Sequence, residues 1–275
     1  KGLMVKTSGK LCYKASARDC HSCFPDKQPG DFFLREQYIK RMFNNVDHFV
    51  SPSAFLRQRY IEWGIAPDLI SVIENGQIKL DNVPSKTVVE QQSEFVRFAF
   101  FGQINPYKGV DVLIGALAGL SREVKKQVLI EIHGANLEYQ SGTYQQSVKD
   151  LLKRHGARVH FHGPYEPQEM PNILSSVDYA VVPSIWWENS PMVIQEAFNL
   201  GVPLIVSDIG GMAEKVTDGV NGLHFRHGSA FDLADKISQC VTQTGLRDEL
   251  KSNIEPPLSI SGCVALHLPI YLELK

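Results

Sequence analysis

The chain has 275 residues, a formal net charge of −2, 43% hydrophobic residues and 21% charged residues. This composition is that of a folded protein with a sizeable core, and it excludes disordered and fibrous proteins. The lack of excess positive charge argues against nucleic acid as the main ligand. No run approaches the roughly 18 apolar residues that span a bilayer, and the start has no apolar signal-peptide core, so we expect a cytoplasmic protein.

The amino-terminal part contains one weak metal-binding pattern. The 5 cysteines are sparse and odd in number, which argues against a disulfide framework. Cys20 and Cys23 have the spacing of half a zinc site, with Cys12 as a third thiol. No second pair follows at a usable spacing, so buried or free thiols are the favoured interpretation and no metal is expected. Residues 1–30 lack periodicity and are expected to be irregular.

From Phe32 to residue 76 the pattern predicts two helices, a short strand at 49–53 and an apolar run at 69–73 that ends in a turn. Ser53 is expected to cap the second helix and Gly64 to end it. Residues 77–94 are polar, contain Pro84 and have no apolar face. We interpret them as a linker.

Six apolar runs then alternate with helical patterns. Near-continuous apolar strands joined by helices indicate a parallel sheet covered on both faces, so the predicted fold class is α/β, with a doubly wound Rossmann-like domain at 95–255. The dinucleotide fingerprint, the P-loop and the nucleophile elbow are absent. The runs are 98–102, 128–134, 159–163, 179–184, 203–208 and 222–225, and the helices after them are 110–120, 144–155, 169–177, 192–200, 212–216 and 231–241.

The most informative segment joins the fourth of these strands to its helix. Pro191 suits the first helical position, and Asn189 and Ser190 suit the N-cap. The free amides of such a helix start favour a phosphate or pyrophosphate. Glu196 lies about 7.5 Å further along the helix axis, beside the place of a ribose. Glu188 precedes the helix and would face a sugar on the other side of the phosphates.

Lys108 follows the first strand of the sheet, across the same crevice. A lone lysine in a loop is usually solvated, but this one is placed to neutralise a diphosphate leaving group. The arrangement suits a nucleotide sugar. Trp186 and Trp187 are candidates for the wall of that pocket, although adjacent residues cannot both point inward.

These motifs resemble the nucleotide-sugar-binding half of GT-B glycosyltransferases of group 1, or family 4. Glu188 and Glu196 form the E-x7-E motif of that family. The other matching segments are 100–114, 159–184, 186–216 and 218–225, while 46–60 and 70–76 resemble the end of the acceptor-binding half.

The resemblance implies a role for each site residue. Lys108 binds the diphosphate, Glu188 contacts sugar hydroxyls, and these two are the candidate catalytic residues. Glu196 binds the ribose. Gln103 stands where many members have arginine and can still donate to a phosphate oxygen, and His162 lies where the base-contacting loop begins unless its ring only packs. The diphosphate and distal sugar would be held by the amides of Asn189, Ser190, Pro191 and Met192.

The implied function is a retaining, metal-independent glycosyltransferase of the hexosyltransferase kind, without a cofactor. Its donor is a nucleotide-diphosphate sugar, and its acceptor a sugar or lipid-linked sugar in polysaccharide or glycoconjugate synthesis. Residues 1–76 would be a remnant of the acceptor-binding domain, and the chain alone would be inactive. A peripheral association with the inner membrane face would use the missing part of that domain. Two alternatives remain: a non-catalytic nucleotide-sugar-binding module, or another GT-B enzyme such as a nucleotide-sugar epimerase.

Residues 256–275 depart from the family pattern. Family members end with a helix that crosses back to the first domain. Here Pro269 interrupts an apolar, charge-poor run, so we expect an atypical tail in place of that helix.

Overall fold

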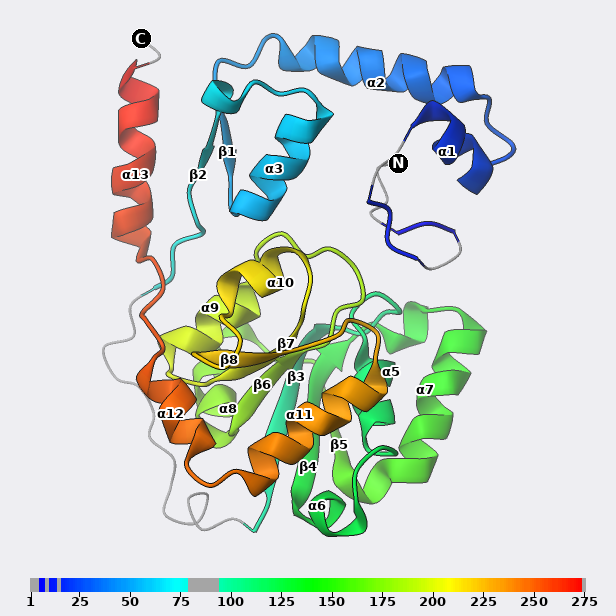
Figure 1. Cartoon of the computed structure of the whole chain (residues 1–275), viewed down its shortest axis with the longest axis vertical. Coiled ribbons are helices and arrows are strands. Elements are labelled where there is room, and N and C mark those ends of the chain that lie inside the picture. Colours follow the sequence, from blue (N-terminus) through cyan, green and yellow to red (C-terminus); the bar gives the residue numbers. More distant parts are fainter. Residues whose placement is uncertain (1–4, 8–9, 14–15, 79–93, 274–275) are drawn as a thin grey trace. The chain divides into compact units, whose positions relative to one another are not determined.

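The computed structural model describes residues 5–7, 10–13, 16–78 and 94–273 (Figure 1). They form two compact units, one made of Lys1–Ile73 with Leu266–Lys275 and the other of Glu74–Ala265. Most of the predicted linker lies outside the described residues. No helix in the described ranges is long and apolar enough to cross a bilayer.

The smaller unit places a two-stranded parallel sheet beside its helices. The Ser53 hydroxyl accepts a hydrogen bond from the Leu56 amide, and Gly64 ends the helix at a φ of 114°, which confirms both predicted helix boundaries. The Arg57 side chain donates to the Ile70 carbonyl at 2.7 Å and ties this helix to the second strand. The elements are α1 (Ala17–Cys23), α2 (Pro29–Phe43), β1 (Phe49–Ser51), α3 (Ala54–Trp63) and β2 (Ile70–Val72).

Helix α1 corrects the expectation that residues 1–30 are irregular. The Ser16 hydroxyl accepts from the Asp19 amide and begins a helix of 7 residues, too short for hydrophobic periodicity to reveal. Within the described part of the chain, Cys12, Cys20 and Cys23 are free thiols and form no group that could hold a metal ion.

The larger unit contains one parallel sheet of six strands in the order β5-β4-β3-β6-β7-β8. The chain runs from β3 outward to β5, returns to β6 beside β3, and then runs outward to β8. The topological switch point therefore lies between β3 and β6, and all six predicted strands are confirmed. The strands are β3 (Val96–Gln103), β4 (Val128–Ala135), β5 (Val159–Gly163), β6 (Tyr179–Val182), β7 (Leu204–Ser207) and β8 (Gly222–Phe225).

Helices cover both faces of this sheet, as the doubly wound fold requires (Figure 1). Helices α6 and α12 were not predicted, because about two turns are too short to show a periodic pattern. On one face lie α5 (Val110–Ala116), α6 (Arg122–Gln127), α7 (Gly142–His155) and α11 (Ala230–Thr242), and on the other α8 (Met170–Ser176), α9 (Met192–Asn199) and α10 (Gly210–Lys215), with α12 (Leu246–Ser252) after α11.

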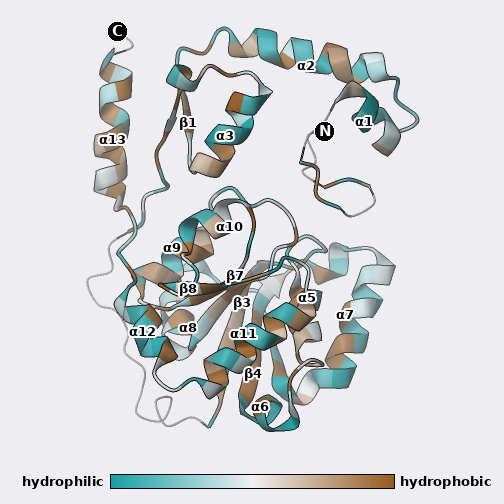
Figure 2. Ribbon diagram, in the orientation of Figure 1, coloured by the Kyte–Doolittle hydropathy of each residue, from teal (hydrophilic) through white to brown (hydrophobic). Residues whose placement is uncertain are grey.

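The core fills the space between the sheet and its helices. Phe98, Ile130 and Ile205 come from three strands, belong to one apolar cluster and are fully buried. The Phe98 ring stacks on the Tyr179 ring with 5.4 Å between centroids, which joins β3 to β6. Figure 2 shows the strands of the sheet mostly in hydrophobic brown. This packing holds the carboxyl ends of β3 and β6 in fixed positions.

The tail is helical, so the expected atypical segment at 256–275 is corrected here. Helix α13 covers Ile260–Glu273. The Ser259 hydroxyl accepts from the Gly262 amide at 3.0 Å, which satisfies one free donor of the first turn. Leucine and alanine favour a helix, and Pro269 removes only one backbone donor from it.

Candidate functional site

The carboxyl ends of β3 and β6 bring Lys108 and Glu188 into direct contact. Lys108 lies between β3 and α5, and Glu188 lies between β6 and α9. Lys108 Nζ donates to Glu188 Oε1 at 2.7 Å, and the two side chains are 28% and 13% exposed. The sequence places these residues on either side of a bound diphosphate, whereas in the structure they form an ion pair beside the switch point.

Two more donors share the same carboxylate oxygen of Glu188. Ser184 Oγ donates to Oε1 at 2.9 Å, and Trp186 Nε1 donates to it at 2.8 Å. Three donors on Oε1 hold the side chain in one orientation, while Oε2 receives none of these bonds. The second oxygen is therefore placed as an acceptor for hydroxyl groups.

The loops after β3 and β6 are locked together at this point. The Trp186 indole stacks on the Tyr107 ring with centroids 5.0 Å apart, and the Ile185 amide donates to the Tyr107 carbonyl at 2.9 Å. Gly109 has a φ of 71°, and a Cβ there would lie 2.0 Å from the Pro183 carbonyl oxygen. Only glycine allows this close approach, so the Lys108 loop is held in register with Glu188.

The start of α9 differs from the predicted one. Pro191, expected at the first helical position, is the N-cap residue, and no side chain caps the helix. Asn189 and Ser190, the expected caps, lie before it in the loop, and the Ser190 hydroxyl is buried without a hydrogen-bond partner in the described residues. Proline has no amide hydrogen, so an anion at this end would be bound by the amides of Asn189, Ser190 and Met192.

The backbone at the start of α10 packs closely against the same loop. The Gly211 amide donates to the Glu188 carbonyl at 2.7 Å. A Cβ on Gly211 would lie 1.9 Å from the Asn189 carbonyl oxygen, far inside the contact distance. The backbone position of Glu188 and Asn189 therefore depends on glycine at 211.

Gly211→Ala is expected to destabilise the protein by about 1–3 kcal/mol, because the methyl group must push the Glu188 loop away. Urea denaturation measures this change. Gly142→Ala is the matched control, since a Cβ at Gly142 meets nothing within 4 Å. An unchanged free energy of unfolding in Gly211→Ala would contradict the described packing of the loop.

Glu196 lies on α9, partly buried. Burial raises the pKa of its carboxyl group, and its charge contributes to the raised pKa of Tyr165, which indicates that the two are neighbours. The adjacent Gln195 is buried and accepts a hydrogen bond from the Gln77 side chain at 2.9 Å. Glu196 is thus a carboxylate held near the surface without an ion-pair partner among the described residues, as a ligand-binding acceptor would be.

His162 belongs to a row of stacked rings on β3, β4 and β5. Its ring stacks on that of His133 with centroids 4.3 Å apart and planes 1° apart, and His133 stacks on Phe101 at 5.2 Å. Burial and the neighbouring His133 lower the pKa of His162. Burial alone would raise the pKa of Glu131, but the neighbouring His133, Arg97 and His162 side chains bring that pKa below its ordinary value.

Glu131, His133 and His160 were not predicted as site residues. The sequence does contain two i, i+2 pairs, Glu131 with His133 and His160 with His162, and the structure places them on neighbouring strands. Gln103 ends β3 with an exposed side chain that bonds to none of the other candidates within the described ranges.

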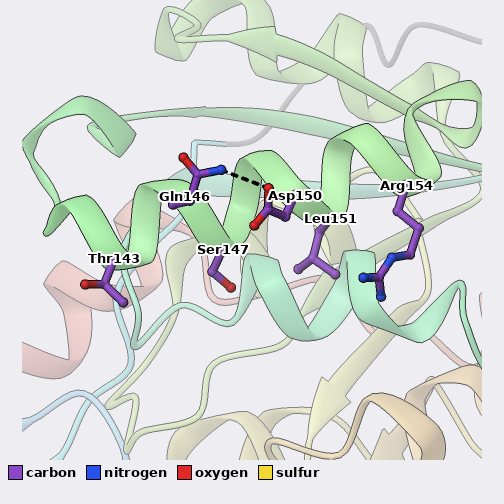
Figure 3. A pocket seen from close by; sticks show the side chains of 6 residues that line it. All are labelled: Thr143, Gln146, Ser147, Asp150, Leu151 and Arg154. Atoms are coloured by element: carbon purple, nitrogen blue, oxygen red, sulfur yellow. Dashed lines mark hydrogen bonds between the residues drawn. The ribbon is translucent and has the colours of Figure 1, made fainter.

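Two depressions in the surface of the larger unit lie away from these residues. One is lined by α7 alone, where the Gln146 side chain donates to Asp150 at 2.8 Å (Figure 3). Its lining residues are Thr143, Gln146, Ser147, Asp150, Leu151 and Arg154. A second is lined mainly by the cationic side chains of α6 and of the end of α7. None of the predicted site residues lines either one.

Comparison with known proteins places this geometry in context. The model of the family described as glycosyl transferases group 1 matches residues 86–255. A lipopolysaccharide 1,2-N-acetylglucosaminetransferase of Salmonella typhimurium is 28% identical over 191 residues, which cover 66% of this chain and 49% of that protein. A D-inositol 3-phosphate glycosyltransferase of Corynebacterium aurimucosum is 34% identical over 146 residues, or 52% of this chain and 34% of that protein. The chain thus spans about half or less of the length of these relatives.

A solved structure shares the fold. Anabaena HepE in complex with UDP-glucose superimposes with a TM-score of 0.72 at 23% identity, covering 88% of this chain and 67% of that one. The family match and the six-stranded parallel sheet agree with one another. The chain therefore belongs to the group 1 glycosyl transferases, with the GT-B type of Rossmann-like domain.

Proposed function

We propose that this chain supplies the donor-binding half of a retaining glycosyltransferase that acts in polysaccharide or glycoconjugate synthesis. The donor is a nucleoside-diphosphate hexose and the acceptor a sugar or lipid-linked sugar. The observation that carries the proposal is the Lys108–Glu188 pair at the switch point of the sheet, beside the start of α9. Support comes from HepE, whose similar fold was solved with UDP-glucose, and from the lipopolysaccharide transferase among the relatives.

The chemistry asked of these residues is mainly electrostatic. In the transfer, the bond between the anomeric carbon and the diphosphate oxygen breaks, and negative charge grows on the departing diphosphate. Lys108 and the amides at the start of α9 stabilise that charge. The acceptor hydroxyl forms the new bond on the same face of the sugar, and its proton passes to the departing diphosphate oxygen. We propose that this step needs no bound metal ion, because the lysine and the helix start supply the positive charge.

Lys108 can serve both the diphosphate and Glu188. An ammonium group has three donors, and the ion pair with Glu188 uses one of them. The remaining donors are available to phosphate oxygens, while Glu188 Oε2 accepts from sugar hydroxyls. The ion pair thereby connects the residue that binds the departing diphosphate with the residue that binds the sugar. It holds the diphosphate and the sugar in the orientation that the transfer requires.

Glu196 is proposed to accept hydrogen bonds from the ribose, at a cost in stability. Because burial raises its pKa in the folded state, ionisation of Glu196 disfavours folding as the pH rises above the unfolded pKa of about 4.3. Glu196→Gln is therefore expected to raise the melting temperature slightly at neutral pH, with the gain disappearing below about pH 4. The same variant should bind the donor about tenfold more weakly. Thermal melts from pH 3 to 8 measure the change in stability, and titration calorimetry measures the change in donor affinity. A lower melting temperature at neutral pH would contradict the assigned cost of ionising Glu196.

A second candidate function is a binding module that holds a nucleotide sugar without turning it over. The short span of the chain relative to its curated relatives favours this for the chain by itself. An epimerase of the GT-B class would use the same crevice. The three differ in their products: a transferase needs a sugar acceptor, an epimerase releases an isomerised sugar without one, and a module releases nothing.

The test incubates the chain, alone and joined to an acceptor-binding half, with labelled nucleotide sugars, with and without lipopolysaccharide or oligosaccharide acceptors. Calorimetry under the same conditions measures donor binding. Binding together with acceptor-dependent transfer supports the transferase, and binding without turnover supports the module. Failure to bind any of the UDP, GDP and ADP sugars would overturn both.

A further inference from the structure

A group of metal-ligating side chains lies on two strands of the sheet, apart from the Lys108–Glu188 pair. Glu131 is on β4, and His160 and His162 are on β5. One ligand atom of each lies within 4.8 Å of the other two. Glu131 is 6% exposed, whereas both histidines are exposed. A buried carboxylate with two exposed imidazoles forms a site that is anchored on one side and open to solvent on the other.

Strand geometry explains why these three side chains meet. Side chains two apart on a strand point to the same face, so His160 and His162 share a face. Glu131 lies directly opposite His160 in the register of β4 and β5. The strand spacing of about 4.8 Å then brings the carboxylate between the two imidazoles.

The two carboxylate oxygens of Glu131 have different neighbours. Arg97 lies 3.7 Å from Oε1, while His162 Nε2 lies 4.0 Å from Oε2. His133 Nε2 is 3.6 Å from that second oxygen and has no hydrogen-bond partner in the described residues. The ring of His133 also stacks on His162, so it orients both a carboxylate and an imidazole as a neighbour of metal ligands does.

We propose that Glu131, His160 and His162 bind one divalent metal ion of the zinc type. Two imidazoles and a carboxylate are ligands that suit zinc and cobalt, whereas calcium and magnesium prefer oxygen ligands alone. Ligand atoms around a tetrahedral zinc at about 2.1 Å are roughly 3.4 Å apart, so the exposed rings close inward by about 1 Å. Water fills the fourth position. The ion joins the edge strand β5 to β4.

Of the three proposed metal ligands, only His162 is also a candidate residue of the donor site. A metal ion on His162 would remove that ring from any contact with the donor base. Donor binding and metal binding can therefore be measured separately, and failure of one leaves the other intact.

The test titrates untagged protein with zinc chloride in a calorimeter and records its spectrum with cobalt. We expect one zinc per chain and at least a 100-fold loss of affinity in the double variant His160→Gln/His162→Gln. His227→Gln is the matched control. His227 also lies beside a carboxylate, 2.9 Å from Asp208, but this pair contains one histidine where the proposed site contains two. This variant should bind zinc as the wild type does. The cobalt complex should lack the strong near-ultraviolet band of thiolate ligands.

Two results would overturn the proposal. One is an unchanged zinc affinity in the double variant when circular dichroism shows it to be folded. The other is a thiolate band in the cobalt spectrum that Cys20→Ser removes, which would assign the metal to the cysteines. If the double variant does not fold, His160→Gln alone decides the question, because this ring is exposed on an edge strand: a tenfold loss supports the site and no loss rejects it.

Discussion

Lys108→Ala is expected to weaken binding of the nucleotide-sugar donor by about 100-fold, which corresponds to roughly 2.7 kcal/mol. The substitution removes the cation that faces the diphosphate and also leaves Glu188, whose side chain is only 13% exposed, without its ion-pair partner. Both effects act at the same place. Titration calorimetry with a nucleoside diphosphate and with the matching nucleotide sugar measures the change.

Lys149→Ala is the control for general loss of positive charge, because Lys149 is exposed on α7, far along the chain from the pair. Its donor affinity should equal that of the wild type. If Lys108→Ala binds nucleoside diphosphates as well as the wild type does, the lysine does not contact the diphosphate and its assigned role is wrong.

Glu188→Gln is expected to lower the rate of sugar transfer by roughly 10²–10³-fold while weakening donor binding only about tenfold. The amide keeps the shape of the side chain and can still accept from Trp186, but it loses the ion pair with Lys108. The sugar then binds in a less defined orientation, which affects the transition state more than the ground state. Steady-state kinetics of the chain joined to an acceptor-binding half, with acceptor present, separate the two effects.

Trp186→Phe provides a milder test of the same contact. It removes the 2.8 Å hydrogen bond to Glu188 and retains a ring that can stack on Tyr107. A fall in turnover of a few-fold, much smaller than in Glu188→Gln, is expected. If both variants leave turnover unchanged, Glu188 has no part in orienting the sugar.

Much of the fold could be predicted from local patterns. Most of the six strands were predicted because they are buried, nearly continuous apolar runs, as in 203–208, bounded by turn residues. Strand β5 is the exception, because its three central residues are exposed. The helix at Ala17–Cys23 and the two short helices α6 and α12 were missed because two turns contain too few residues for a periodic signal. Helix α13 was missed for another reason: Pro269 argues against a helix locally, while Ser259 and the residues around it favour one.

The candidate site could be predicted only in part. The position of Lys108 and Glu188 at the ends of neighbouring strands follows from the alternation of strands and helices. Their direct ion pair, and the two further donors on Glu188, depend on tertiary packing that no spacing reveals. The metal-ligating group was missed for the same reason, since Glu131 and His160 become neighbours only through the register of β4 and β5.

The placement of the donor is tested most directly by a donor-binding titration of this chain with UDP, GDP and ADP sugars, alongside Lys108→Ala and Glu196→Ala. We expect the wild type to bind at least one of them and both variants to lose at least tenfold in affinity for it. Equal affinity in the wild type and both variants would contradict the placement of the donor between the Lys108 loop and helix α9.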